Sequence, residues 1–358
     1  MNLMIMKIFT TIKKNISNFF KDIINLTNFF LKKKNTFICF FNENKHTIKY
    51  LEYFLNKKCR RKKVVLITFK EIDFKNSNCI ILHLRSNFFR EFFFLTANYK
   101  YLYSTTPNLN SSIFKKSVRS KIKYVYIQHS PISLLKAYHK KAFLDFDAVQ
   151  AINSYQHREV SILNKLHKKN IKAFKSKYYF IENIKKQNKV KIDVLIAPTW
   201  KTNFYELKYH YILDDLFKKN NIDYILRPHP MSILKKEVRI EDLKKNNINF
   251  DLDPELKLDK YLNLISNWSG IFIEFALVNR KMPYHINTSK KFFSETYFDE
   301  YETFEEHATR SITYTLDINN ISKINFNDFK NSSVKKMSEE ASTINQFYNK
   351  FFYNDIQF

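Results

Sequence analysis

From Met1 to Lys34, apolar side chains recur at steps of three and four residues, with lysines between them. The apolar positions are Ile5, Ile8, Phe9, Ile12, Ile16, Phe19, Phe20, Ile23, Ile24 and Phe30, and the interleaved lysines are Lys7, Lys13, Lys14, Lys21 and Lys32 to Lys34. This periodicity predicts a basic amphipathic helix. Such a helix can lie in the interface of an anionic bilayer or pack on the domain that follows it, and the pattern leaves both possibilities open.

Beyond this helix, short apolar runs alternate with stretches of helical periodicity. The runs occupy residues 37–41, 64–69, 80–84, 124–128 and 148–152 and, after a polar stretch at 181–191, residues 194–197, 224–226, 264–265 and 284–286. Helical patterns over 205–220, 270–279 and 335–351 separate or follow the later runs. Alternation of this kind predicts an α/β fold with parallel sheets. The predicted organisation is an N-terminal helix at 1–34, a first Rossmann-like domain at 35–180, a second at 181–334 and a C-terminal helix at 335–358 that could return to the first domain.

The composition restricts the function, because the chain of 358 residues contains a single glycine, Gly270. A dinucleotide-binding fingerprint needs two or three glycines, and a P-loop and a G-x-S-x-G nucleophile elbow need two each. None of these motifs can be present. Because the chain has lost nearly every other glycine, we expect Gly270 to mark a position where a side chain would obstruct a neighbouring group or a ligand.

The charge balance is strongly basic, with 61 Lys and Arg against 34 Asp and Glu and a net charge of +27. A basic chain can bind nucleic acid, an anionic membrane surface or a phosphorylated substrate. The lysines are spread over the whole length, which favours a solvated surface, so we expect no nucleic-acid partner. A non-enzymatic basic module that binds nucleic acid or membrane is an alternative.

The cysteines and histidines indicate no metal site. Cys39, Cys59 and Cys79 form no C-x-x-C pair, which argues against zinc and disulfides and favours a reducing cytoplasm. No H-E-x-x-H motif occurs, and we expect no metal or other cofactor. No apolar run is long enough to span a bilayer, and lysines interrupt the first apolar stretch, so we expect neither a transmembrane segment nor a cleavable signal peptide.

The most informative segment is residues 264–280, LISNWSGIFIEFALVNR, which predicts a strand, a turn and a helix. Ser269 and Gly270 fall at the start of the helix, where backbone N–H groups and the helix dipole favour a phosphate. Glu274 follows Gly270 by about one helical turn, so its carboxylate could face the same pocket and accept a ribose hydroxyl. The alternative is an ordinary helix start with Ser269 as N-cap and Glu274 in solvent.

Two other strand ends carry histidines. In Asp223–Pro230, DYILRPHP, two prolines stiffen a turn that presents Arg227 and His229. The guanidinium of Arg227 can hold a phosphate, and His229 can transfer a proton or hydrogen-bond a phosphoryl oxygen. In residues 124–133, YVYIQHSPIS, the strand delivers His129, a candidate base on the first domain. Each segment could also be an ordinary strand end.

With these segments, the chain resembles the CDP-glycerol glycerophosphotransferase family, bacterial enzymes that build polyol-phosphate polymers such as teichoic acids. The resemblance covers about residues 80–290. It is carried by APTW at 197–200, RPHP at 227–230 and SNWSGIFIEFA at 266–276, with a weaker echo in STTPNL at 104–109 and YIQHS at 126–130.

The resemblance implies a GT-B-type architecture of two Rossmann-like domains facing across a cleft, with the nucleotide held mainly by the C-terminal domain. It also implies peripheral attachment to the inner face of the cytoplasmic membrane. In this family, two histidines act on the phosphoryl group, and they map onto His129 and His229. The residues that bind the donor's phosphates map onto Thr199, Lys201, Ser269 and Gly270.

The chain departs from the family pattern at three places. It has Lys201 where arginine is usual, Asn267 to Gly270 where an aspartate-tyrosine-serine-serine run is usual, and Ser130 and Pro131 where glycine and threonine commonly follow the histidine. The S-G-x-x-x-E form at 269–274 is also similar to the nucleotide-binding helix of UDP-N-acetylglucosamine 2-epimerases, in which the glutamate contacts ribose.

These features lead to the hypothesis of a transferase that moves a glycerophosphate-like group from a CDP-linked donor to a hydroxyl of a membrane-linked glycan or polyol-phosphate acceptor, releasing CMP. His129 would deprotonate the acceptor, and Arg227 and His229 would stabilise the transferring phosphate. The alternative is the same architecture acting on a nucleotide sugar, as a glycosyltransferase or an epimerase.

Overall fold

The computed structural model divides the chain into two units. The described residues are 2–32, 38–43, 47–72, 74–111, 114–118, 121–182, 192–253, 256–290, 301–318, 327–330 and 334–354. The first unit comprises Met1–His129, Lys141–Gln150 and Val160–Phe174, and the second comprises Ser130–Lys140, Ala151–Glu159 and Lys175–Phe358. The chain thus passes between the units repeatedly. The single division expected after residue 180 stays a prediction.

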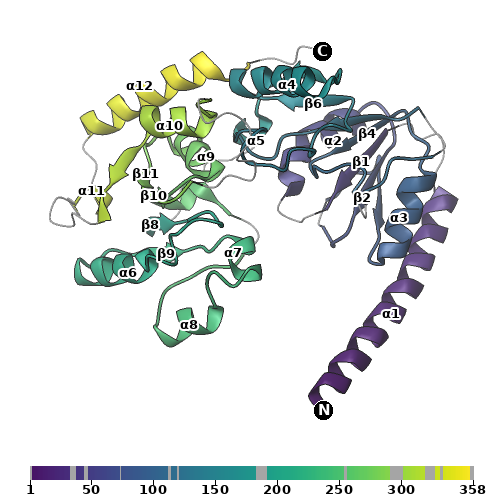
Figure 1. Cartoon of the computed structure of the whole chain (residues 1–358), viewed down its shortest axis with the longest axis horizontal. Helices are drawn as coiled ribbons and strands as arrows, with labels where there is room; N and C mark the ends of the chain where they lie inside the picture. The colour runs from purple at the N-terminus through teal and green to yellow at the C-terminus, as the bar shows by residue number, and fades with distance from the viewer. Residues whose placement is uncertain are drawn as a thin grey trace. The chain divides into compact units, whose positions relative to one another are not determined.

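The first unit contains a seven-stranded sheet in the order β3-β2-β1-β4-β5-β6-β7 (Figure 1). Its strands are β1 Ile38–Asn42, β2 Val64–Thr68, β3 Cys79–His83, β4 Tyr101–Ser104, β5 Lys123–Tyr126, β6 Ala148–Ala151 and β7 Lys172–Lys175. The pairs from β3 through β6 are parallel. Every residue of β1 and β2 is buried, as expected for central strands of a parallel sheet covered on both faces.

Helices pack on this sheet. The first helix, α1 Asn2–Lys32, contacts β3, and α2 Ile48–Cys59 contacts β1 and β2. Two more, α3 Asn87–Thr96 and α4 Ser154–His167, follow β3 and β6 in the chain. The predicted N-terminal helix is therefore confirmed for residues 2–32, while Met1, Lys33 and Lys34 lie outside the described residues.

One face of α1 packs on the first unit. Phe29 is buried, and its ring centroid lies 6.0 Å from that of Phe93 in α3. Asp22 is fully buried, and its carboxylate accepts hydrogen bonds from the N–H groups of Arg85, at 2.9 Å, and Ser86, at 2.6 Å. Ser86 is the N-cap of α3, where the helix dipole stabilises a carboxylate. Packing on the domain, one of the two expected alternatives, is therefore observed for this face.

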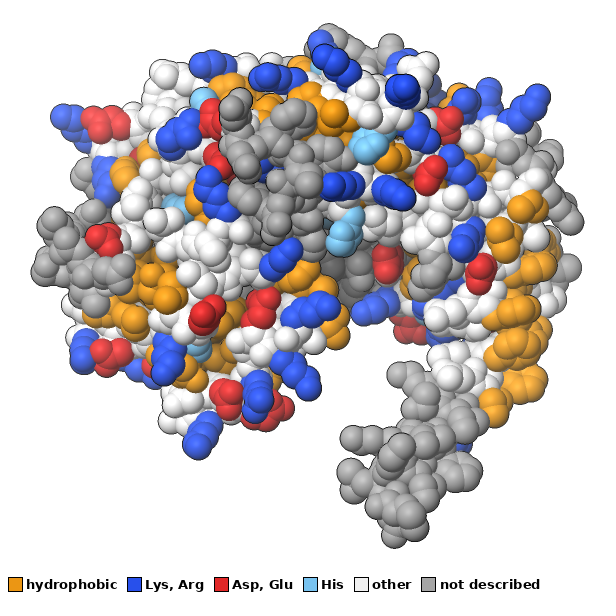
Figure 2. Space-filling view, viewed as in Figure 1, with side chains coloured by type: hydrophobic (Ala, Val, Ile, Leu, Met, Phe, Trp, Pro, Cys, Tyr) orange, Lys and Arg blue, Asp and Glu red, His pale blue; other side chains and the backbone are white. Residues whose placement is uncertain are grey.

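Another face of α1 is exposed, together with part of α3, and we call this surface the exposed apolar face. Its residues are Ile16, Phe19, Phe20, Ile23, Ile24, Phe30, Phe88 and Phe92. Figure 2 shows hydrophobic side chains gathered along α1. Within the described part of the chain, no helix combines the length and the apolar character that crossing a bilayer requires.

The second unit contains a five-stranded parallel sheet in the order β12-β11-β10-β8-β9. Its strands are β8 Ile192–Ile196, β9 Tyr224–Leu226, β10 Tyr261–Ser266, β11 Tyr284–Ile286 and β12 Tyr314–Leu316. A buried core that includes Ile196, Leu213, Phe217 and Ile265 joins the sheet to helix α6 Tyr209–Lys219.

The buried helix α9 Gly270–Asn279 is the centre of the second unit. It contacts β10, α5 Tyr179–Glu182, α10 Phe304–Ile312 and α12 Val334–Phe351. The remaining helical segments described are α7 Pro230–Leu234, α8 Ile240–Lys245, the 3-10 turn η2 Leu258–Lys260 and α11 Asn327–Lys330. The C-terminal helix α12 contacts α9 and α10, both within the second unit.

The α/β class and the parallel sheets expected from the sequence are confirmed. The predicted strand runs correspond to β1, β2, β3, β5, β6, β8, β9, β10 and β11, and the helix predicted over 270–279 is α9. The hydrophobic pattern missed β4, β7 and β12.

Candidate functional site

Four turns lie at the carboxyl edge of the second sheet, because β8, β9, β10 and β11 are neighbouring parallel strands. Ligands of open parallel sheets bind beyond this edge. These turns carry the expected catalytic residue His229 and five residues expected to bind the donor: Thr199, Lys201, Arg227, Ser269 and Gly270.

Asn267 links three of these turns. Its Oδ1 accepts a hydrogen bond from the N–H of Thr199 at 2.7 Å. Its Nδ2 donates to Thr202 Oγ1 at 3.1 Å and to Thr288 Oγ1 at 3.3 Å. The side chain is fully buried, and only an amide can both accept and donate in this way. In the sequence, Asn267 stands out only as a departure from the family pattern, because its three partners are distant in the chain.

The two cations expected in the site, Lys201 and Arg227, both make hydrogen bonds within the second unit, Lys201 through its backbone and Arg227 through its side chain. Lys201 has a left-handed backbone with a φ of 59°, and its N–H donates to Glu237 Oε1 at 2.8 Å. That conformation costs a residue other than glycine about 1 kcal/mol. Arg227 pairs with Asp251 through an Nη1 to Oδ2 distance of 3.0 Å and donates to the carbonyl of Asp253. A phosphate at this edge would therefore share the Arg227 guanidinium with Asp251.

His229 is the N-cap of α7. Its Nδ1 accepts a hydrogen bond from the N–H of Met231 at 3.1 Å, so a neutral imidazole here carries its proton on Nε2. The centroids of the His229 and Trp200 rings are 6.3 Å apart, which brings the APTW and RPHP turns together. In this tautomer, Nε2 is a hydrogen-bond donor rather than a base.

Gly270 is the first residue of α9 and follows the N-cap Ser269. A Cβ built on Gly270 would lie 2.1 Å from Ser130 Oγ, 3.2 Å from Pro131 Cδ and 3.1 Å from Ile132 Cγ2. A side chain at position 270 would therefore clash with the segment that follows His129 in the chain. The N-cap role of Ser269 is observed, and phosphate binding by Ser269 and Gly270 stays a prediction.

Glu274 is buried on α9 and accepts a hydrogen bond from the hydroxyl of Tyr178. The alternative in which Glu274 lies in solvent is therefore wrong. The other side chains of this helix are almost all apolar. A buried carboxylate there needs a hydrogen-bond donor, because removing a carboxylate from water without one costs free energy. The expected contact with ribose stays a prediction.

His129 belongs to the first unit, where its Nδ1 lies 2.9 Å from the hydroxyl oxygen of Tyr126. The ring centroid of Tyr50 is 6.3 Å from that of His129. A general base needs a lone pair on Nε2, and in that tautomer the Nδ1–H donates to Tyr126. Tyr126 is fully buried and therefore gives the imidazole a fixed orientation. Tyr126 was not predicted from the sequence as a site residue, although it stands three residues before the histidine.

Two buried carboxyl groups hold the segment that follows His129. The N–H of Ser133 donates to both carboxylate oxygens of Glu305 at 3.0 Å, and its hydroxyl donates to Glu159 Oε1 at 2.6 Å. The N–H of Leu134 donates to Glu159 Oε2 at 2.7 Å. Burial raises the pKa of Glu159 to about 8, against the effect of these hydrogen bonds. This network lies wholly within the second unit.

The structure thus brings the Thr199, His229 and Ser269 turns together in the second unit and places His129 with Tyr126 in the first. Among the described residues, no group of three His, Cys, Asp or Glu side chains is arranged to hold a metal ion.

No known family profile matches the sequence, and no curated protein matches it. Solved structures do match. The wall teichoic acid polymerase TagF has a TM-score of 0.57 at 11% identity, over 96% of this chain and 94% of the TagF chain. A TagF structure soaked with CDPG has a TM-score of 0.54 at 12% identity, over 94% and 92% of the two chains. The UDP-GlcNAc 2-epimerase of Methanocaldococcus jannaschii, in complex with UDP-GlcNAc and UDP, has a TM-score of 0.52 at 10% identity, over 87% and 99%.

The chain has a GT-B-type fold. The GT-B class expected from the sequence is confirmed by these likenesses, and the resemblance to the CDP-glycerol family holds at the level of the fold. The GT-B-type fold is shared by enzymes of different chemistry, so the residues of the site, rather than the fold, determine the reaction.

Proposed function

We propose that this GT-B-type chain is an enzyme that transfers a glycerophosphate-like group from a CDP-linked polyol to a hydroxyl of a membrane-linked glycan or polyol-phosphate acceptor, releasing CMP. The observation that carries the proposal is the meeting of the APTW, RPHP and SNWSG turns at one sheet edge, joined by Asn267 and by the Trp200 and His229 rings. The fold shared with TagF, a wall teichoic acid polymerase, supports it.

In the proposed reaction, His129 Nε2 takes the proton of the acceptor hydroxyl, and the acceptor oxygen forms a bond to the distal phosphorus of the donor. The bond from that phosphorus to the bridging oxygen breaks, and the oxygen leaves on CMP. His229 donates its Nε2–H to a phosphoryl oxygen as charge develops there, and Arg227 adds positive charge. Tyr126 accepts the Nδ1–H of His129 when Nε2 carries the lone pair that a base requires, and it holds the ring in place.

The donor would be held by the other turns. Lys201, the hydroxyl of Thr199 and the N–H groups at Ser269 and Gly270 would bind the diphosphate. Glu274 would accept a hydrogen bond from a ribose hydroxyl.

A nucleotide panel and one substitution test the proposal. We expect CDP-glycerol or CDP-ribitol to raise the melting temperature of the full chain, and His229→Ala to slow CMP release by at least about 100-fold while the chain still folds. The control is His139→Ala, which removes an exposed histidine outside these turns. Full turnover by the His229 variant would contradict the assignment.

A GT-B glycosyltransferase that uses a nucleotide sugar is the second candidate. It is favoured by the likeness to the UDP-GlcNAc 2-epimerase and by the S-G-x-x-x-E form of the α9 start. Stabilisation by UDP-sugars and by no CDP-polyol would support it. Salt-sensitive nucleic-acid binding with no nucleotide effect would instead support a non-enzymatic basic module.

We further propose that an anionic membrane surface, on the inner face of the cytoplasmic membrane, binds the exposed apolar face. Phe20 and Ile24 on this face are 61% and 60% exposed, and Lys13 and Lys21 on the same helix are also exposed. Asp22, the acidic residue of α1, is buried and hydrogen-bonded. The helix therefore offers apolar side chains and positive charge to a partner, which suits an anionic bilayer.

A further inference from the structure

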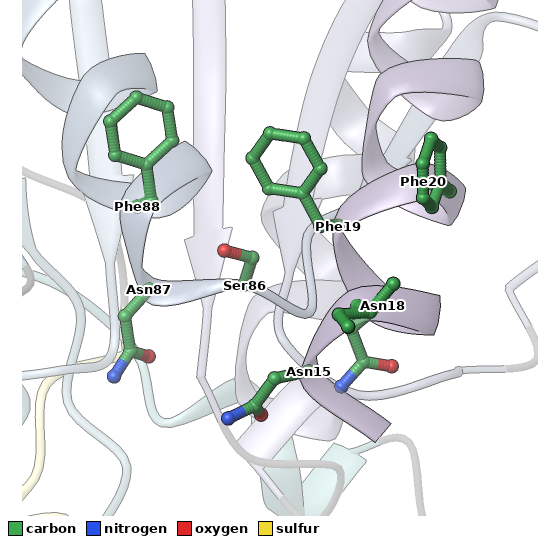
Figure 3. A pocket seen from close by; sticks show the side chains of 8 residues that line it. Asn15, Asn18, Phe19, Phe20, Ser86, Asn87 and Phe88 are labelled. Atoms are coloured by element: carbon green, nitrogen blue, oxygen red, sulfur yellow. The ribbon is translucent and has the colours of Figure 1, made fainter. Parts of the chain in front are cut away.

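A groove with a volume of about 610 Å³ lies between α1 and the start of α3 (Figure 3). Its lining is formed by Asn15, Ile16, Asn18, Phe19, Phe20, Ser86, Asn87 and Phe88. None of these residues carries a charge, although charged residues make up 27% of the chain. The ligand that fits the groove is therefore one that needs no counter-ion.

The lining combines amides and a hydroxyl with aromatic rings. In the view of Figure 3, the Phe19 and Phe88 rings stand on one side with the Ser86 hydroxyl between them, and the Asn15 and Asn87 amides lie on the other. The two ring centroids are 6.4 Å apart. Amides can donate and accept hydrogen bonds to several hydroxyls at once, while rings pack against the carbon face of a sugar or polyol.

The start of α3 next to the groove is closed to a phosphate. The N–H groups of Arg85 and of the N-cap Ser86 donate to the buried carboxylate of Asp22, which therefore lies at the N-terminus of α3, where an anion would otherwise bind. A phosphate at this point would meet that negative charge at close range. The chemistry of the groove therefore favours an uncharged polyhydroxyl group.

The groove is continuous with the exposed apolar face. Four residues, Ile16, Phe19, Phe20 and Phe88, belong to both, and Phe88 is 63% exposed. If this face lies against a bilayer, the groove opens at the level of the lipid headgroups. A lipid whose acyl chains lie beside Phe20 could then place its headgroup among the amides.

We propose that the groove binds the uncharged sugar or polyol headgroup of a membrane lipid. This inference rests on the membrane contact proposed above and names the lipid chemistry recognised there. It gives the first unit a way to hold a lipid-linked acceptor at the membrane surface independently of the donor turns of the second unit.

Vesicle sedimentation of the full chain tests the proposal without any assay of transfer. The probes are vesicles of phosphatidylglycerol and phosphatidylcholine, with and without a diglycosyl diacylglycerol that replaces part of the phosphatidylcholine. We expect the sugar-bearing lipid to strengthen binding of the natural chain about tenfold. The double variant Asn15→Ala and Asn87→Ala should bind both kinds of vesicle equally, and the control Asn28→Ala, an exposed asparagine of α1 outside the groove, should keep the difference.

The outcomes separate this proposal from the membrane contact. Equal binding of the natural chain to both kinds of vesicle would overturn the groove proposal and leave the membrane contact standing. An enhancement that survives in the double variant would also overturn it, because the lipid would then bind elsewhere. Binding to neither kind of vesicle would overturn the membrane contact and the groove together, while nucleotide binding by the second unit would be unaffected.

Discussion

Ser130 and Gly270 are fitted to each other at the start of α9, where a Cβ on the glycine would lie 2.1 Å from Ser130 Oγ. The residues are 140 positions apart in the chain and belong to the same unit. Ser130 is also the residue directly after His129. The glycine therefore lets the segment leaving the candidate base pack against the helix whose N-terminus is expected to hold the donor.

We expect Gly270→Ala to destabilise the chain by about 1–3 kcal/mol, because the added methyl overpacks this contact. Ser130→Ala in the same chain should recover part of the loss, because it removes the atom at 2.1 Å. Urea unfolding of both single variants and the double variant measures the coupling. Strictly additive effects would show that the contact does not decide the cost.

Tyr126→Phe should lower kcat about 10-fold to 100-fold and leave KM for the donor unchanged, because His129 loses the partner that orients it. Steady-state kinetics with a CDP-polyol make the measurement. Tyr103→Phe is the control, since Tyr103 is also a buried tyrosine of the first sheet and stacks on Phe40 instead. Unchanged kcat in the Tyr126 variant would remove Tyr126 from the mechanism.

Tyr178→Phe should lower the free energy of unfolding by about 1–3 kcal/mol, because the Glu274 carboxylate loses its donor in an apolar environment. Glu274→Gln should lower the free energy of unfolding less than Tyr178→Phe does, but it should weaken nucleotide binding about tenfold. Urea unfolding and calorimetric titration with the nucleotide separate the two effects. If Glu274→Gln binds nucleotide with unchanged affinity, Glu274 is a packing residue and the ribose contact is wrong.

Stability should depend on pH through Glu159. Its pKa is about 8 in the folded chain against an ordinary value of 4.5, mainly because burial disfavours the charged form. The folded state thus binds the proton more tightly, so the contribution of Glu159 to stability is full at low pH and is lost as pH rises from 4.5 through about 8. Glu159→Gln cannot titrate, and its melting temperature should fall less than that of the natural chain between pH 5 and 8. Parallel melting curves of the two proteins would contradict this.

Phe20→Ser with Ile24→Ser should weaken binding to phosphatidylglycerol vesicles at least about tenfold, because two exposed apolar side chains no longer enter the bilayer. The melting temperature should stay the same. Phe29→Ser provides the contrast, since Phe29 is 3% exposed and its loss should destabilise the fold. Undiminished vesicle binding by the double variant would place the membrane contact elsewhere.

The fold was largely predictable because its signals are local. The apolar runs of β1 and β2 and the periodicity of α1 and α9 lie within single segments and need no knowledge of their partners. Parallel topology then followed from alternation, and it placed the motif turns at one sheet edge.

The contacts within the site were not predictable, because they join residues distant in sequence. The sequence identified Gly270 as unusual but could not identify Ser130 Oγ as the atom that a Cβ on this residue would meet. It placed Glu274 one turn along α9, yet a helix buried on nearly all sides offers no solvent face, and Tyr178 is the partner. Asn267 was not recognised for the same reason, since the role of a buried amide can be assigned only when its hydrogen-bond partners are known.

The repeated passage of the chain between the two units has a consequence for its biosynthesis. Residues 130–140 and 151–159 leave the ribosome early. The first segment contacts Gly270 and Glu305 and the second contacts Phe304, which are all translated more than a hundred residues later. The first sheet can assemble once β7 has emerged, while these two segments wait without their partners. A nascent or prematurely terminated chain would therefore expose Ser130, Ser133 and Tyr155 to chaperones and proteases until its last quarter is made.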